Sequence, residues 1–147
     1  MTHLDIAAKL SFVKEATNHN DGPWVEAILR VVDCHKGDPW CAAFVHFCLA
    51  IATGGKAPLP ATASCEALHQ FAKTHGMLVT EPQAGDVFLV LTPQGHAHHT
   101  GFCTSAASGG RVGTIEGNTN TDGSREGWGV FARSRALSPQ LAFIRLS

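Results

Sequence analysis

The hydrophobic period of this 147-residue chain changes halfway along its length. In the first half, apolar residues recur at the three- and four-residue spacing that is typical of amphipathic helices. Asp21 and Ser64 stand where N-terminal caps are expected, and Pro23 suits a first helical turn. Gly76 suits a C-terminal cap. The spacing predicts four helices: His3 to Thr17, Trp24 to Val32, Cys41 to Ala52 and Ser64 to His75.

The second half alternates apolar and polar residues in short segments that are separated by turns rich in glycine, proline, serine and asparagine. A polar loop is expected from Asn118 to Gly127. Helices followed by short strands with tight turns predict the α+β class with an antiparallel sheet. The expected strands are Asp86 to Leu91, His98 to Thr104, Arg111 to Glu116, Val130 to Arg135 and Leu141 to Leu146.

Length and composition indicate one globular domain over residues 1–147, with 44% hydrophobic and 16% charged residues. The formal net charge is −1 and no basic stripe occurs, so we expect no binding to DNA, RNA or anionic membranes. The most apolar run is interrupted by His46 and is too short for membrane insertion.

The N-terminal residues MTHLDIAAKLSFVKEA carry Asp5 early and lack a basic start and an unbroken apolar centre. A secretory signal peptide has a basic start and an unbroken apolar centre, and this segment has neither. We therefore expect synthesis in the cytoplasm without a signal peptide. Action outside the cytoplasm would require delivery by another system.

Five cysteines occur, an odd number, and no CxxC pair is present. This pattern favours neither a structural zinc site nor a disulfide framework. Cysteine outside such sites packs as a small hydrophobic residue. We expect that role for Cys34, Cys48, Cys65 and Cys103.

Cys41 differs from the other cysteines because it falls at a helix start, after Asp38 and Pro39, either of which can open the helix. Unpaired backbone N–H groups and the positive end of the helix dipole favour a thiolate there. The position is also compatible with ordinary core filling. Cys41 is therefore a candidate nucleophile that needs a partner.

The segment GHAHHTGFCT, residues 95–104, places several histidines in a strand-like stretch. Alternation puts His96 and His98 on one face and His99 with Gly101 on the other. A histidine on a buried strand face can act as general base for a cysteine on a packed helix. The alternative is a set of surface histidines on an edge strand.

A base histidine needs a third group that accepts its other N–H and fixes its tautomer. In TIEGNTN, residues 114–120, Glu116 and Asn118 would share one strand face and either can supply that group. The same residues are also common where a strand runs into a turn. In order along the chain, cysteine, histidine and carboxylate or carboxamide match the nucleophile, base and orienting group of papain-like catalysis.

Four segments make the chain resemble the CHAP family of cysteine- and histidine-dependent amidohydrolases and peptidases, within the NlpC/P60-like group. They are GDPWCAAFVHFC, PQAGDVFLV, HHTGFC and TIEGNTNTDGSREGWGVFARSR, in the order of the family. The resemblance implies a papain-like fold in which N-terminal helices pack on a small antiparallel sheet. It is similar to the compact single-domain CHAP proteins of phages and bacteria.

The resemblance implies that Cys41 is the nucleophile and that His99, not its neighbour His98, is the base. Glu116 matches the third catalytic residue, with Asn118 in support. Asp38 and Trp40 are candidates for the oxyanion or substrate pocket. Asp86 matches a structural aspartate of the family. No metal and no cofactor are implied.

The function implied is hydrolysis of a peptidoglycan amide, in the stem peptide or at N-acetylmuramoyl-L-alanine. We expect peptidoglycan or its fragments as partner, with an immunity or inhibitor protein if the enzyme is an antibacterial effector rather than a phage lysin. Three alternatives stay open. One is a thiol amidohydrolase with a non-wall substrate, another is a zinc hydrolase built on His96 and His98, and the last is a non-catalytic module on the same scaffold.

Overall fold

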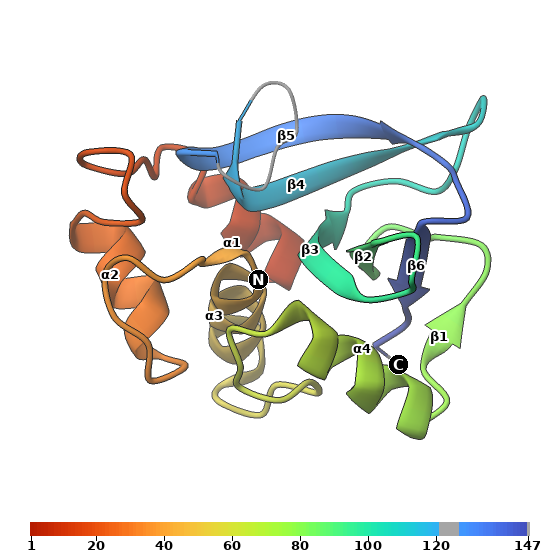
Figure 1. Cartoon of the computed structure of the whole chain (residues 1–147), viewed down its shortest axis with the longest axis horizontal. Coiled ribbons are helices and arrows are strands. Elements are labelled where there is room, and N and C mark those ends of the chain that lie inside the picture. Colours follow the sequence, from red (N-terminus) through yellow and green to blue (C-terminus); the bar gives the residue numbers. More distant parts are fainter. Residues whose placement is uncertain (121–126, 147) are drawn as a thin grey trace.

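The computed structural model describes residues 1–120 and 127–146. Within these ranges, four helices come first and six strands follow, which confirms the α+β class (Figure 1). The helices are α1 (His3–Lys9), α2 (Pro23–Arg30), α3 (Cys41–Thr53) and α4 (Cys65–Thr74). The strands are β1 (Leu78–Val79), β2 (Val87–Leu91), β3 (Ala97–Cys103), β4 (Arg111–Thr119), β5 (Gly129–Ala136) and β6 (Leu141–Ile144).

The strands form one antiparallel sheet in the order β1-β6-β2-β3-β4-β5. The two-residue strand β1 has no counterpart in the sequence-based prediction, because so short a segment shows no alternation. Helix α3 lies against β3 and β4, α4 lies against β3, and α1 and α2 pack on α3. The helical half therefore covers one face of the sheet, as Figure 1 shows.

Helix α3 lies at the centre of the protein, and seven of its thirteen residues are buried. It is apolar on all sides, as expected for a helix enclosed by other elements. Gly117 on β4 allows the close approach of the sheet. A Cβ atom there would lie 2.8 Å from Trp40 Cζ3 and 2.8 Å from Phe44 Cγ. The small residue thus fixes the distance between the sheet and the first turn of α3.

Helix α1 begins with a capping box between Thr2 and Asp5 and ends at Lys9. The prediction that this helix continues to Thr17 is wrong. Beyond it, the Val13 carbonyl accepts from the Val130 amide at 3.1 Å, and the Glu15 amide donates to Trp128 at 2.8 Å. The backbone here serves the edge of the sheet instead of a helix. This is a tertiary contact that no local pattern encodes.

Two predicted caps are also displaced. Gly22 precedes α2 with φ 109°, and the Asp21 carboxylate binds Thr17 instead of capping the helix. Ser64 does cap α4, where its hydroxyl accepts from the Ala67 amide at 3.1 Å. The C-cap of α4 is His75, one residue before the expected glycine. The N-cap of α2 is therefore Gly22 instead of Asp21, and the C-cap of α4 is His75 instead of Gly76.

The two faces of the sheet carry different apolar clusters. Val87 and Leu89 of β2 belong to the core under the helices, while Phe88 between them points to the other face. On that face it packs with Cys103, Val112 and Phe143. Because both faces of the sheet carry apolar clusters, side chains between the strands are shielded from water, which matters for the charged residues of the site described below.

Cysteines 48, 65 and 103 are buried, as predicted, but Cys34 is half-exposed. It follows helix α2 in an irregular segment, where apolar packing is incomplete. Among the described residues, no helix is both long and apolar enough to cross a membrane.

Candidate active site

Cys41 is the first residue of α3 and is completely buried. Trp40, not Asp38 or Pro39, occupies the N-cap position, and it makes no side-chain hydrogen bond to the helix end. The backbone N–H groups of the first turn therefore lack a capping side chain. Their partial positive charge stabilises a thiolate at Cys41.

His99 lies on β3 with 2% of its surface exposed, so it is not a surface histidine. Its Nε2 atom donates to Glu116 Oε1 at 2.8 Å across the β3–β4 pair. Its Nδ1 atom is buried and makes no hydrogen bond to the described residues. The imidazole nevertheless interacts with the side chain of Cys41. Because Nε2 is held by Glu116, we assign Nδ1 to the cysteine side.

Glu116 is fully buried on β4 and holds its charge through several donors. Arg135 of β5 donates Nε to Oε2 at 2.7 Å and Nη2 to Oε1 at 2.7 Å. The Thr114 hydroxyl donates to Oε2 at 2.6 Å. Burial alone would raise the pKa of this carboxyl, but Arg135 and His99 outweigh it and lower the pKa to about 2.

The same balance sets the protonation of His99. Burial alone would lower its pKa, but the interactions of the ring with the side chains of Cys41 and Glu116 raise it to about 9. The imidazole is therefore protonated at neutral pH. This charge pattern favours a thiolate at Cys41 beside an imidazolium at His99.

Gly101 makes room for this arrangement. A Cβ atom there would lie 2.7 Å from Phe88 Cε1, 2.8 Å from the Ile115 carbonyl oxygen and 3.0 Å from Glu116 Cγ. Any larger residue would push against the side chain that orients His99. The glycine two residues after the histidine is thus required by the close packing of Glu116.

Asn118 does not join the hydrogen-bonded chain. The β4–β5 register shifts between Glu116 and Thr119, and Asn118 has φ 56°, so the expected alternation with Glu116 is broken. Its side-chain amide is buried and has no hydrogen-bond partner among the described residues. Asn118 also lies in β4 and not in a loop, while residues 121–126 of the loop expected there fall outside the described residues.

The two pocket candidates lie in different surroundings. Trp40 is fully buried, and its Nε1–H donates to Glu15 Oε2 at 2.7 Å, so its indole donor already has a partner. Asp38 lies in a groove, and its carboxylate accepts from the His35 amide at 2.9 Å. The groove has a volume of about 470 Å³ and is lined by Val32, Cys34, Asp38, Pro39, Ala61, Thr62, Ala63 and Ser64.

The zinc alternative requires His96 and His98 on one face of one strand, but β3 contains His98 alone of the two. His96 precedes β3 and is exposed, while His98 lies within β3 and is half-buried. Across residues 1–120 and 127–146, no three histidine, cysteine, aspartate or glutamate side chains come together in a group that could hold a metal ion.

Two contacts of the site were not predicted from the sequence. Arg135 binds both oxygens of Glu116, and Cys65 Sγ lies 3.5 Å from Cys41 Sγ. Arg133 and Arg135 are two residues apart on β5, a spacing that places both on one strand face, but no spacing identifies Glu116 as the partner of Arg135. Cys65 starts α4, so two helix starts converge on the candidate nucleophile. That convergence depends on how the helices pack.

Four helices on an antiparallel sheet, with a cysteine at the start of the central helix beside a strand histidine, define a papain-like cysteine hydrolase. The family model of the CHAP domain matches residues 33–118, more than half of the chain. The protein therefore belongs to the CHAP family and is a cysteine-dependent amidohydrolase or peptidase. A search of curated proteins found no match.

Proposed function

We propose that the protein hydrolyses an amide bond of peptidoglycan, with Cys41 as nucleophile, His99 as general acid and base, and Glu116 as the positioning residue for His99. The observation that carries the proposal is the buried chain from Cys41 through His99 and Glu116 to Arg135. Buried charges are costly unless they are paired. Glu116 is paired with both His99 and Arg135, and such a pair beside a cysteine at a helix start is suited to thiolate chemistry.

In the proposed reaction, the Cys41 thiolate attacks the carbonyl carbon of the amide and a tetrahedral oxyanion forms. The Cys41 backbone N–H, at the start of α3, donates to that oxyanion. His99 then gives its Nδ1 proton to the departing amine, which leaves a thioester on Cys41. A water molecule, deprotonated by His99, hydrolyses the thioester and restores the thiolate.

Glu116 stabilises the imidazolium form of His99 and keeps Nδ1 directed at the sulfur. Arg135 holds both carboxylate oxygens, so Glu116 cannot rotate away from the ring. Asn118 makes no bond to His99, and we assign it no direct part in the proton transfers.

The groove beside Asp38 is the proposed entrance for substrate. Pro39 lies two residues before the nucleophile, and Ser64 immediately precedes Cys65, which contacts the nucleophile. Because Cys41 is fully buried and its Sγ contacts Cys65 Sγ, we propose that the scissile carbonyl reaches the sulfur only after side chains around it, such as Cys65, move. Among the residues that line the groove, Asp38 carries the one carboxylate.

The test is mass spectrometry of soluble fragments released from purified peptidoglycan. Wild-type protein is expected to release fragments whose masses distinguish cleavage at N-acetylmuramoyl-L-alanine from cleavage within the stem peptide. Cys41→Ala should release none, while Cys48→Ala, a matched change of a cysteine of the same helix that does not line the groove, should keep wild-type release. Equal release by Cys41→Ala and wild type would rule out the thiol mechanism. Labelling by an active-site thiol probe without fragments from several wall types would instead point to a non-wall amide.

We also propose delivery to the wall or periplasm by another system, such as phage lysis or secretion into a rival cell. A secreted effector would need an immunity protein that fills the groove next to Cys41. Co-purification with the product of a neighbouring gene tests this, and Asp38→Arg should weaken such a complex without unfolding the protein. A phage lysin would show no such partner.

A further inference from the structure

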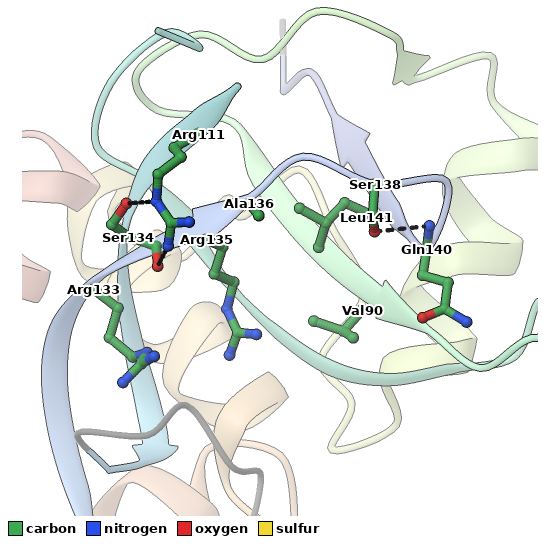
Figure 2. A pocket seen from close by; sticks show the side chains of 9 residues that line it. All are labelled: Val90, Arg111, Arg133, Ser134, Arg135, Ala136, Ser138, Gln140 and Leu141. Carbon is green, nitrogen blue, oxygen red and sulfur yellow. Dashed lines mark hydrogen bonds between the residues drawn. The ribbon is translucent and has the colours of Figure 1, made fainter. Parts of the chain in front are cut away.

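The second site that we consider lies on the β4–β5 hairpin, away from the groove at Cys41. Arg111, Arg133 and Arg135 line one hollow of about 270 Å³. Figure 2 shows the three arginine side chains along one side of it, with Val90, Leu141 and Gln140 on the other side. None of the described residues that line the hollow is acidic.

The charge of this hollow is unusual for the protein. The whole chain has 11 lysines and arginines and a formal net charge of −1, yet three of the arginines meet here. Like charges that line one hollow repel one another, and salt screens this repulsion less where water is partly excluded. Among the described residues, Glu116 is the one carboxylate that pairs with this group, and it binds Arg135. No carboxylate of residues 1–120 or 127–146 is paired with Arg111 or Arg133.

The arginines are also held in place before any ligand arrives. Arg111 donates Nε to Ser134 Oγ at 2.8 Å and Nη2 to the Ser134 carbonyl at 2.8 Å. Arg133 donates Nη1 to the Asn120 carbonyl at 2.9 Å. Guanidinium groups fixed in this way lose little side-chain entropy when they bind an anion.

The Arg133 side chain carries an unsatisfied donor. Its Nε atom is buried and has no hydrogen-bond partner among the described residues. A buried N–H without an acceptor is energetically unfavourable. An oxyanion in the hollow would offset the positive charge of the arginines that line it. The hydroxyl of Ser138 and the amide of Gln140 add neutral polar groups on the opposite rim.

From these observations we infer that the hollow at Arg111, Arg133 and Arg135 binds a small, doubly charged oxyanion of the phosphate class. Guanidinium forks match the oxygen spacing of phosphate and bind it bidentately. The volume is below the range of drug-sized ligand pockets and suits one phosphate group. The phosphate is either a free ion or the end group of a phosphate monoester. The inference does not depend on the wall substrate.

The test is isothermal titration of the full-length protein with inorganic phosphate and with O-phosphoserine, at constant ionic strength, with acetate as the singly charged control. Wild type should bind phosphate saturably with one site per chain. Arg111→Gln/Arg133→Gln should bind at least about tenfold more weakly. Arg30→Gln, which removes an exposed arginine at the end of α2, should bind like wild type.

Arg135 is left unchanged because it holds Glu116. Tighter binding of O-phosphoserine than of phosphate would identify a monoester as the ligand, and equal binding would identify the free ion. An Arg111→Lys/Arg133→Lys variant keeps the charge and tests the fork geometry if the glutamine variant melts early. Equal phosphate affinity in wild type and both double variants, or absence of saturation in wild type, would overturn the inference.

Discussion

Two arginine–carboxylate pairs in this protein have nearly the same geometry and different surroundings. Arg135 Nε meets Glu116 Oε2 at 2.7 Å, and Arg145 Nε meets Asp86 Oδ1 at 2.7 Å. Both carboxylates are buried, with 0% and 3% of the side chain exposed, and both arginines keep contact with solvent. By distance and burial alone, the two pairs would be taken as equivalent.

They differ in what else the carboxylate binds. Asp86 accepts the Gln83 amide at 2.8 Å and so secures the turn before β2. Glu116 accepts the ring N–H of His99 and so sets the charge of the candidate catalytic base. In the proposed mechanism, the same interaction therefore stabilises the fold at Asp86 and tunes a proton transfer at Glu116. The third partner of the carboxylate, and not the ion pair, decides its role.

The largest effect is expected from Glu116→Gln. Loss of the negative charge removes the carboxylate that stabilises and orients the imidazolium at His99, and kcat/KM should fall by about 10³-fold. The measurement is amide hydrolysis at pH 7 with a soluble muropeptide, with near-ultraviolet circular dichroism to verify folding. The matched change Asp86→Asn should leave kcat/KM within about twofold of wild type. Equal losses in the two variants would remove the distinction between the pairs.

Asp86→Asn should instead act on stability. The change weakens the bond to Arg145 and the hold on the Gln83 amide, and the free energy of unfolding should drop by about 2 kcal/mol. Urea denaturation of wild type and variant measures this, with the slope of the transition as a check on two-state unfolding. A midpoint unchanged from wild type would show that the turn is held by other contacts.

The pH profile sharpens the comparison further. The pKa of His99 is about 9, above its ordinary value, so the proton that it must give to the leaving amine is present below pH 9 and lost above it. The alkaline limb of kcat/KM should therefore lie near pH 9. Removal of the Glu116 charge lowers the pKa of His99, so Glu116→Gln should move this limb to lower pH. Asp86→Asn should leave the limb where it is in wild type.

The smallest effects are expected from lysine at the two arginines. Arg135→Lys keeps the charge but loses the two-pronged grip on Glu116, so kcat should fall a few-fold, with the alkaline limb displaced. Arg145→Lys makes the same change at Asp86 and should leave kcat and the limb unaltered. A displaced limb in Arg145→Lys, or none in Arg135→Lys, would contradict the assigned roles.

Much of the fold could be predicted because local patterns and tertiary demands agree. The four helix cores and five of the strands follow from hydrophobic period, and Ser64 caps its helix as expected. The failures occur where the two disagree. Val13 to Glu15 pair with β5 instead of continuing α1, and the bulge at Asn118 interrupts an alternation that the sequence continues. Distant backbone partners, absent from any short window, decide both cases.

The candidate site divides in the same way. The sequence by itself predicted a candidate nucleophile at Cys41, since a cysteine after Pro39 and Trp40 at a helix start is exposed to the dipole wherever that helix packs. It also predicted His99 and Glu116 as the candidate base and third residue, in the order of the family. Only the tertiary structure decided that Glu116 reaches His99 while Asn118 does not, and that Arg135 and Cys65 join the site. The physical reason is that strand register and helix packing set distances of a few ångströms between residues far apart in the chain, and hydrogen bonds and pKa values depend on those distances.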